Sequence, residues 1–335
     1  MKDIAEIISG LSPETQKRVK LASEVVLERL EMPSLGMNKA LDGGIVYGRM
    51  TLLWGNKSSG KSSLALQMVA NAQKAEKVCA WIDSEASFDP VWASRLGVDI
   101  EQLIHVNIKT VAELAEIGTN LISRGVDLLV VDSISALAPS SWFEKDDEMK
   151  EFNDTHQIGA FSKDLTKAIN MLNVINENSA IVFISQIRNK FSTWGATQRP
   201  MGGEGIIFYC STIIKLWSSA SDREQKKGDL YVGDKIFERN MGREVTWTIE
   251  YNKTGAPSIS GTYDFYYLGE RIGIDMHGEI VDLAIQYGII ENKARSAWYT
   301  INDEKYQGRG AVISAVRDDE LLFKEIQEKL YEQIS

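Results

Sequence analysis

A segment around Gly60 carries the residue types and spacing of a phosphate-binding loop. It matches the pattern G-x-x-x-x-G-K-[ST] at every fixed position and reads, in order, Gly55, Asn56, Lys57, Ser58, Ser59, Gly60, Lys61 and Ser62. In such a loop, backbone N–H groups point inward and the N-terminus of the following helix adds partial positive charge. The segment therefore predicts binding of a nucleotide phosphate chain.

The roles of the polar side chains follow from this geometry. Lys61 can reach the β- and γ-phosphates, and Ser62 can offer its hydroxyl to Mg²⁺, with Ser63 beside it at the start of the helix. We therefore expect a nucleotide and Mg²⁺ as cofactors. A chance loop rich in glycine, serine and lysine is the alternative, since such compositions are common in linkers.

The flanking elements favour the phosphate site. Residues 50–54 are apolar and predict a buried strand, and residues 63–75 place Leu64, Met68 and Ala72 at helical spacing. The glycines then lie on a strand-to-helix turn, which is the context that the pattern requires.

A second apolar strand supplies a carboxylate for the metal. Residues 126–131 suit a central parallel strand buried on both faces, and Asp132 follows at its carboxyl end, where ligands bind in α/β sheets. A strand that simply ends in a capping aspartate is the alternative. Beside a phosphate loop, Asp132 is expected to orient the water shell of Mg²⁺.

The composition is that of an ordinary globular protein. Of the 335 residues, 44% are hydrophobic and 25% are charged, and the formal net charge of −10 argues against general binding of polyanions. No apolar run approaches the ~18 residues of a membrane helix, and the N-terminus lacks a signal-peptide pattern, so we expect a cytoplasmic protein with no membrane partner. Cys79 and Cys210 lie in apolar segments and are expected to be buried free thiols.

We expect three parts along the chain. Residues 1–34 predict a helical arm for oligomerisation, which packs either on a neighbouring subunit or back on its own core. Residues 35–268 predict the main core, and residues 269–335 predict a small α+β lobe with a strand pair near Trp298 and a closing helix over 318–334. The arm's apolar positions are Ile4, Ile7, Ile8, Leu11, Val19, Leu21, Val25, Val26 and Leu30.

The core alternates strands and helices, which predicts an α/β fold with a mostly parallel twisted sheet flanked by helices. The expected strands cover residues 50–54, 78–83, 103–106, 126–131 and 180–185. The expected helices cover residues 63–75, 90–96, 110–124 and 158–175. Further strands at 211–217, 244–251 and 262–268 follow, the later ones antiparallel.

Two segments without periodicity carry opposite charge. Residues 142–154 hold six acidic residues against two lysines, a balance of −4, and predict a mobile acidic loop. Residues 186–204 carry Arg188, Lys190 and Arg199 against Glu204, a balance of +2. We expect this second segment to be a loop that contacts nucleic acid, with a plain surface loop as the alternative.

Several motifs in order resemble the bacterial RecA recombinase family. They are the phosphate loop with its strand (48–63), Trp81–Glu85, Asp89–Asp99, Leu129–Ser133 and Ile184–Arg188, followed by a C-terminal stretch from Gly278 to Gly308. The resemblance covers roughly residues 35–330 and implies a RecA-type ATPase core that uses ATP and Mg²⁺. A short N-terminal arm and the lack of an acidic tail depart from the cellular proteins and suggest a divergent or phage-encoded member.

The resemblance implies roles for residues around the nucleotide. Glu85 would act as the base that polarises the attacking water, with a solvated turn residue as the alternative, and Gln186 would sense the γ-phosphate. Asp89 and Trp92 match adenine-side positions, although Trp92 could equally be a core residue. Lys253 matches one of two lysines that reach the neighbouring subunit's ATP. The other falls on Tyr251, and Lys235, Arg239 or Arg243 could compensate.

The resemblance also assigns DNA contact to the two loops. In the second loop, Arg188, Lys190 and Arg199 would meet phosphates, Gly202 and Gly203 would let the backbone approach a strand, and Phe191 or Trp194 would wedge between bases. The negative charge of Glu204 would be unfavourable next to a DNA phosphate. On the helix behind the first loop, the family's two arginines fall on Lys163 and Asn170, which indicates a weaker contact there.

The expected function is that of a DNA-dependent ATPase of recombination and repair. It would form a helical filament on single-stranded DNA, pair it with homologous double-stranded DNA and exchange strands. The alternatives are a hexameric helicase or translocase motor on the same fold, and a nucleotide-gated scaffold without catalysis. The resemblance of the C-terminal lobe and of the Gln186 segment favours the recombinase.

Overall fold

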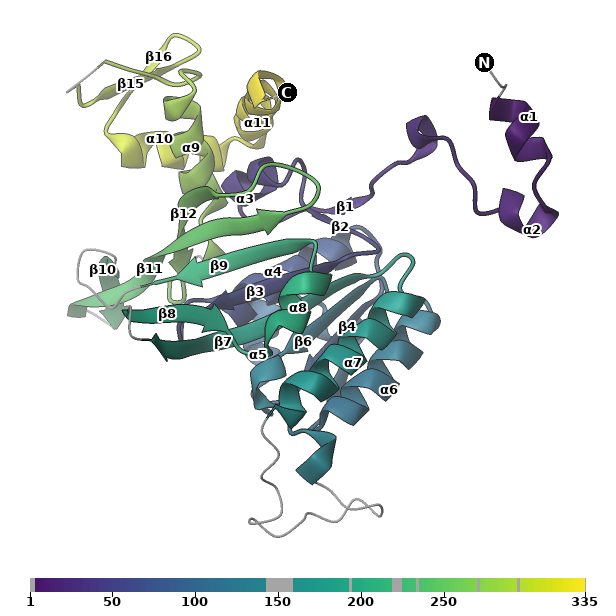
Figure 1. Cartoon of the computed structure of the whole chain (residues 1–335). Helices are drawn as coiled ribbons and strands as arrows, with labels where there is room; N and C mark the ends of the chain where they lie inside the picture. The colour runs from purple at the N-terminus through teal and green to yellow at the C-terminus, as the bar shows by residue number, and fades with distance from the viewer. Residues whose placement is uncertain are drawn as a thin grey trace.

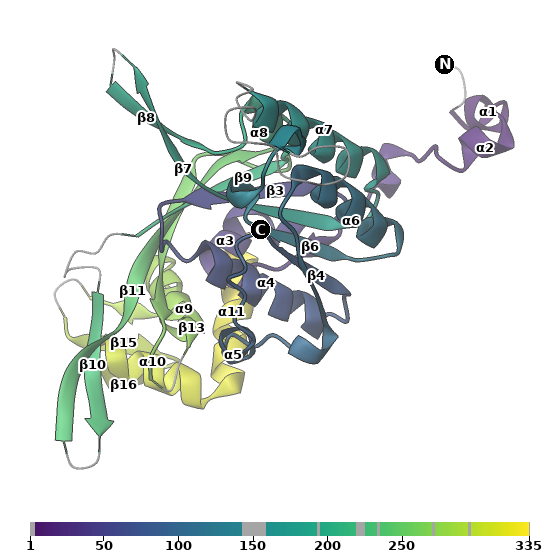
Figure 2. The same cartoon turned by 90° about the horizontal axis from the view of Figure 1, so that it is seen from below.

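A twisted sheet runs through the protein (Figure 1), and two of its hairpins project from the core (Figure 2). The computed structural model describes residues 4–142, 159–192, 195–218, 225–232, 235–269, 272–293 and 296–334. Within these residues the sheet has 11 strands, in the order β13-β12-β11-β9-β3-β7-β6-β4-β5, with β8 added to β7 and β10 added to β11.

The parallel half of the sheet matches the strands expected from sequence. It consists of β9 (Thr212–Trp217), β3 (Met50–Gly55), β7 (Ala180–Ser192), β6 (Leu128–Asp132), β4 (Cys79–Asp83) and β5 (Leu103–Asn107). Leu128 to Val131 are fully buried, as predicted for a strand covered on both faces. The expected α/β fold is confirmed.

Helices cover both faces of these strands (Figure 2). The helix α4 (Lys61–Lys74) packs on one face, and α6 (Val111–Ser123) and α7 (Ala160–Ile175) pack on the other. Two separate apolar clusters result, one around Leu64 and Met68 and one around Leu114 and Leu165. The short helices α5 (Pro90–Arg95) and α8 (Glu204–Tyr209) complete the core.

The sheet continues in antiparallel strands that are longer than the sequence indicated. β11 (Lys235–Asn252) pairs with β9 and with β12 (Ile259–Tyr266), and β12 pairs with β13 (Gly273–Ile274). The first half of β11 forms a hairpin with β10 (Gln225–Val232), which projects from the core (Figure 2). Sequence analysis found only the half of β11 whose alternating side chains, such as Val245 and Trp247, reach the core.

The loop expected over residues 186–204 is instead mostly a β-hairpin. β7 continues to Ser192 and pairs antiparallel with β8 (Gly195–Pro200), so that Ile187 lies opposite Pro200 and Arg188 opposite Arg199. A hairpin that projects from the core has no face to bury, so its residues show no apolar alternation. The prediction of an irregular loop was therefore wrong. Residues 143–154 of the expected acidic loop lie outside the described residues.

The N-terminal arm contains less helix than expected. Helices α1 (Ile4–Ser9) and α2 (Pro13–Gln16) are short, and residues 17–28 form only a 3₁₀ turn at Ala22–Glu24 before β1 (Arg29–Leu30), which pairs with β2 (Ile45–Val46). No residue between 4 and 28 is buried, and the arm reaches away from the core (Figure 1). Short helices without a packing partner are marginal, so the apolar spacing alone does not sustain one. The arm does not fold back on its own core.

The C-terminal lobe has its own apolar cluster. It contains the helices α9 (Met276–Gln286), α10 (Arg309–Asp318) and α11 (Glu320–Ile334), and a small sheet of β14 (Glu291–Asn292), β15 (Trp298–Ile301) and β16 (Glu304–Gln307). The sequence pattern did not predict the helix α10. Leu35, at the start of α3 (Leu35–Ala40), belongs to this cluster, so α3 links the lobe to the core.

A buried carboxylate fastens the lobe to α3. Glu279 of α9 is 8% exposed and accepts hydrogen bonds from Ser34 Oγ at 2.5 Å, from the backbone N–H of Leu35 at 2.9 Å and from that of Gly36 at 3.0 Å. Burial raises the pKa of Glu279 to about 7, and these three hydrogen bonds oppose the shift. A side chain from the lobe thus satisfies the free N–H groups at the start of a core helix.

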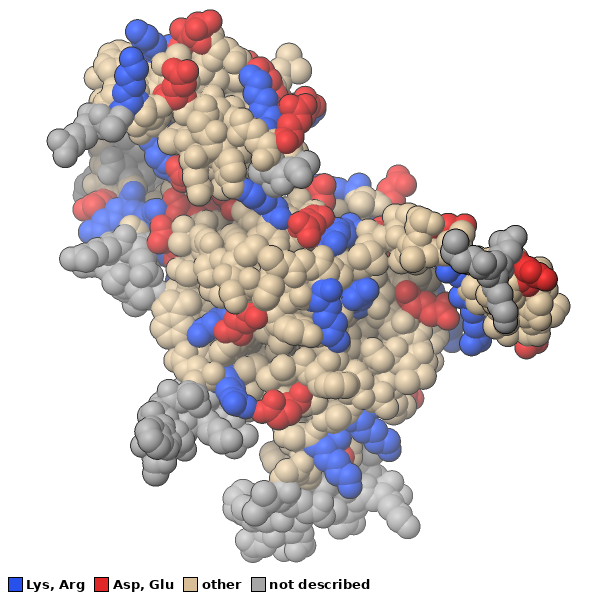
Figure 3. Space-filling view, turned by 45° about the horizontal axis from the view of Figure 1, so that its top comes forward, with Lys and Arg blue, Asp and Glu red and all other residues tan. Residues whose placement is uncertain are grey.

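The surface carries no large patch of one charge on the face seen in Figure 3, where lysine and arginine alternate with aspartate and glutamate. Within the part of the chain that the structure describes, no helix is both long and apolar enough to cross a membrane.

We predict that the attachment of the lobe depends on pH. Because the pKa of Glu279 rises from its ordinary 4.5 to about 7 on folding, its contribution is fully present below about pH 4.5 and is lost as pH rises through 7. In urea unfolding, the stability of the wild type relative to Glu279→Gln should fall by on the order of 2 kcal/mol between pH 4.5 and 8. A difference that is constant with pH would contradict the assignment.

Candidate active site

The carboxyl ends of four parallel strands bring the candidate residues to one edge of the sheet. Gly55 at the end of β3 lies beside Gln186 of β7, and Asp83 at the end of β4 lies beside Asp132 of β6. β3, β4 and β6 end at this level, whereas β7 continues beyond Gln186 to Ser192, and this edge is where α/β proteins bind ligands.

The phosphate loop requires its glycines for space and backbone conformation. A Cβ on Gly55 would lie 1.9 Å from the carbonyl oxygen of Leu216, so only glycine fits there. Gly60 precedes α4 with a φ of 87° in the left-handed region. Asn56 fixes the loop edge, because its side chain donates to the carbonyl of Ser218 at 2.7 Å and accepts from the N–H of Ser218 at 3.3 Å.

Lys61 lies inside the loop and is 8% exposed. Its Nζ donates to the carbonyl oxygens of Asn56 at 2.8 Å and of Gly55 at 3.2 Å. Burial lowers the pKa of Lys61, while the carboxylates of Asp132 and Glu85 favour its charged form. A phosphate group would offer this ammonium a stronger, charged acceptor.

Ser62 and Asp132 lie together where Mg²⁺ is expected to bind. The Ser62 side chain hydrogen-bonds the carboxylate of Asp132, which is 6% exposed. Burial raises the pKa of Asp132 to about 6, and Ser62 opposes the shift. One hydroxyl and one carboxylate beside a phosphate site fit Mg²⁺, which keeps several waters and takes few protein ligands. When bound, Mg²⁺ would neutralise charge on the phosphates.

Glu85 belongs to a hydrogen-bonded group that faces this site. Its Oε1 accepts from Ser133 Oγ at 2.6 Å and from Gln186 Nε2 at 3.1 Å. Ser133 is held in turn by Ser84, whose Oγ donates to the Ser133 carbonyl at 2.5 Å. Sequence analysis missed Ser133, although it directly follows Asp132.

The turn that carries Glu85 depends on Asp83. The buried carboxylate of Asp83 accepts from the backbone N–H groups of Glu85 at 3.0 Å, Ser87 at 2.8 Å and Phe88 at 3.0 Å. Asp83 therefore positions the Glu85 backbone.

A cavity of about 340 Å³ opens beside the phosphate loop. Trp92 lines it together with Ser58–Ser63 and the ring-bearing residues Phe265 and Tyr267, so Trp92 is both half-buried and beside the phosphate loop. Asp89 does not line it. Its carboxylate caps α5 by accepting from the N–H groups of Val91 at 2.9 Å and Trp92 at 3.2 Å.

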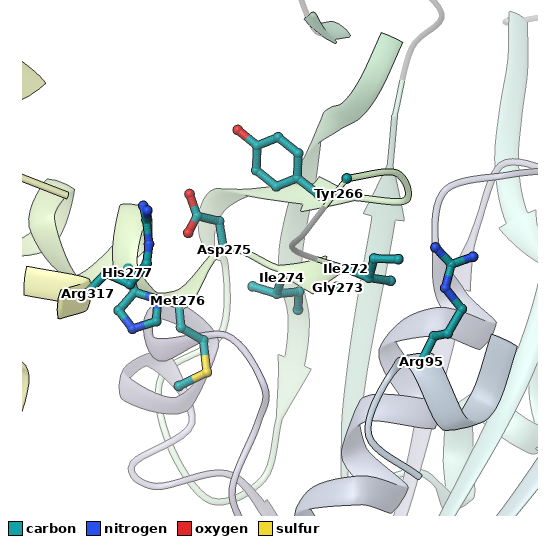
Figure 4. A pocket seen from close by; sticks show the side chains of 10 residues that line it. Arg95, Tyr266, Ile272, Gly273, Ile274, Asp275, Met276, His277 and Arg317 are labelled. Atoms are coloured by element: carbon teal, nitrogen blue, oxygen red, sulfur yellow. The ribbon is translucent and has the colours of Figure 1, made fainter. Parts of the chain in front are cut away.

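A second cavity, of about 520 Å³, lies at the junction of core and lobe (Figure 4). Arg95 stands on one side of it and Asp275, His277 and Arg317 on the other. Helix α5 separates the two cavities, since Trp92 lines the first and Arg95 the second. None of the phosphate-loop residues lines the second cavity, so we do not include it in the site.

The DNA-binding candidates gather on and behind the β7–β8 hairpin. Arg188 and Lys190 lie on β7, but the side chains of residues 188–197 and the whole of Trp194 lie outside the described residues. Arg199 of β8 forms a short ion pair with Glu204, and both side chains are exposed. Glu204 thus neutralises a charge that the sequence analysis counted as available for phosphate.

The glycine pair and Lys163 occupy the base of this hairpin. Gly202 is buried, and a Cβ there would lie 3.0 Å from Leu165 and 3.1 Å from Ile134, which gives it a packing role. Gly203 is exposed and precedes α8. Lys163 is exposed on α7, next in sequence to Ser162, whose Oγ would be 3.1 Å from a Cβ on Gly203.

The residues expected to act across a subunit interface are separate from this cavity. The Lys253 side chain is exposed, and Tyr251 is 42% exposed. Neither lines the 340 Å³ cavity. Arg243, considered from sequence as a compensating charge for a neighbour, instead contacts the phosphate loop of its own chain by donating to the carbonyl of Ser58 at 2.9 Å.

The comparison with known families agrees with this geometry. The family model described as the RecA N-terminal domain matches residues 14–262, which is most of the chain. The matched span includes the phosphate loop, Glu85, Asp132, Gln186 and the β7–β8 hairpin. This chain therefore belongs to the RecA family of recombinase-type, ATP-binding and DNA-binding proteins.

Proposed function

We propose that this protein is a DNA-dependent ATPase that assembles as a helical filament on single-stranded DNA, pairs it with homologous duplex and exchanges strands. Base pairing would read the sequence while the protein holds the backbone. ATP and Mg²⁺ would occupy the phosphate loop, with Lys61 on the phosphates and Ser62 and Asp132 on the metal side. A cytoplasmic location is part of the proposal, and the buried free thiols Cys79 and Cys210 support it.

One observation carries the proposal, namely the hydrogen bond of 3.1 Å between Gln186 Nε2 and Glu85 Oε1. Gln186 sits on β7 beside Gly55 of the phosphate strand, and the same strand continues into the hairpin with Arg188 and Lys190. A change at the γ-phosphate that alters the Glu85–Gln186 contact would therefore act directly on a strand that carries basic residues.

The base of the hairpin is held to the core by the same residues. The Gln186 carbonyl accepts from the N–H of Met201 at 3.1 Å, and Ser185 Oγ donates to the Met201 carbonyl at 3.0 Å. The Gln186 N–H donates to Ser135 Oγ at 2.9 Å. Displacement of Gln186 would thus move both strands of the hairpin together, which is what a nucleotide-dependent change in DNA affinity needs.

We predict that Lys61→Ala removes ATP binding and hydrolysis together, because the buried ammonium meets the phosphates directly. ATPase turnover and nucleotide affinity, measured with and without single-stranded DNA, test this. Turnover above about a tenth of the wild-type rate would refute the phosphate-loop assignment.

Glu85→Gln should separate binding from chemistry. The amide keeps the shape and can still accept from Ser133, but it cannot act as a base, so ATP affinity should persist while hydrolysis falls by on the order of 100-fold or more. Single-turnover hydrolysis beside an equilibrium titration measures both quantities. An unchanged rate would make Glu85 a structural residue only.

Gln186→Ala should keep ATP bound but lose the gain in single-strand affinity that ATP produces, because the link to Glu85 is gone. The ratio of DNA affinities with a slowly hydrolysed ATP analogue and with ADP measures this gain. Ser192→Ala, at the far end of β7, serves as the matched control. If Gln186→Ala keeps the wild-type ratio, coupling through this strand is wrong.

A further inference from the structure

Arg243 stands out because it touches the phosphate loop from outside the phosphate-binding motif. It lies on β11, opposite Phe265 of β12 and Gln225 of β10, at the base of the projecting hairpin. Its Nη1 donates to the carbonyl of Ser58 at 2.9 Å and lies 3.5 Å from Ser218 Oγ. Ser218 Oγ also donates to the Ser58 carbonyl, at 3.2 Å.

The charge of Arg243 is not neutralised within the part of the chain that the structure describes. No described carboxylate forms an ion pair with it, whereas Arg309 and Arg199 are paired with Asp282 and Glu204. Its guanidinium carbon lies 5.7 Å from the ring centroid of Tyr267, which holds the side chain in place without removing its charge.

Arg243 is a half-buried residue and lines the 340 Å³ cavity together with Ser58–Ser63 and Trp92. An unpaired guanidinium at the wall of such a cavity favours an anion, because its fork of donors matches phosphate oxygens and its charge is only partly solvated. A phosphate chain is the anion that the adjoining loop is built to hold. The nucleotide would therefore meet Lys61 from the loop and Arg243 from β11.

We propose that Arg243 is a nucleotide-contacting residue that binds a phosphate oxygen of the nucleotide held by its own chain. This rests on the proposed nucleotide binding and deepens it, because it supplies a positive contact within one subunit.

The experiment is a titration of fluorescent mant-ADP into the full-length protein at low concentration and without DNA, so that neighbours contribute little. Arg243→Ala should weaken binding by about tenfold or more. Arg243→Lys should keep much of the affinity, because it keeps a charge. Arg243→Gln should behave like alanine, since its amide is polar but carries no charge.

Lys227→Ala is the matched control. Lys227 lies on β10 of the same hairpin, is half-exposed, and is 3.9 Å from Glu238 rather than near the loop. Its removal should leave the affinity within twofold of the wild type. Circular dichroism melting of each variant without nucleotide checks that the fold is intact.

Three outcomes separate the possibilities. Wild-type affinity in Arg243→Ala, with binding lost in Lys61→Ala, would overturn this inference and leave the proposed function standing. Wild-type affinity in Arg243→Gln would also overturn it, since nucleotide binding would then not need the positive charge. If the wild-type protein itself fails to bind mant-ADP, the proposed function fails as well.

Discussion

The alignment of four parallel strands at one edge of the sheet is the constraint on which the site depends. Because β3, β6 and β4 end level with Gln186 of β7, Gly55, Gln186, Asp132 and Asp83 lie at one edge of the sheet although they are far apart in sequence. The strands are buried on both faces by two apolar clusters, so their ends are held rigidly. The polar side chains at this edge are therefore held in fixed positions relative to one another.

This edge also explains how a nucleotide site connects to a distant surface. β7 runs without a break from the core, past Gln186, into the projecting hairpin. A continuous hydrogen-bonded strand transmits a displacement better than an irregular loop, because its residues cannot move independently. The ion pair of Arg199 with Glu204 neutralises one of the basic side chains that the sequence places in this segment.

Much of the fold and of the site was predictable from sequence, for identifiable reasons. Strands such as 128–132 are apolar throughout, and the phosphate loop has fixed spacing, so both are visible without structure. The two hairpins were missed because their segments show no alternation of apolar and polar residues in the sequence. Ser133, Tyr267 and Arg243 were missed or misassigned because only the fold brings Ser133 to Glu85, and Tyr267 and Arg243 to the phosphate loop. Glu279 was missed because a helix cap from another lobe has no local signal.

Electron microscopy of the protein with single-stranded DNA and a slowly hydrolysed ATP analogue tests the proposed filament most directly. The account predicts a helical filament that follows the DNA and requires the nucleotide. Closed hexameric rings would contradict it and support a helicase or translocase motor on the same fold. Unassembled protein that nevertheless binds both ligands would contradict it in favour of a nucleotide-gated scaffold.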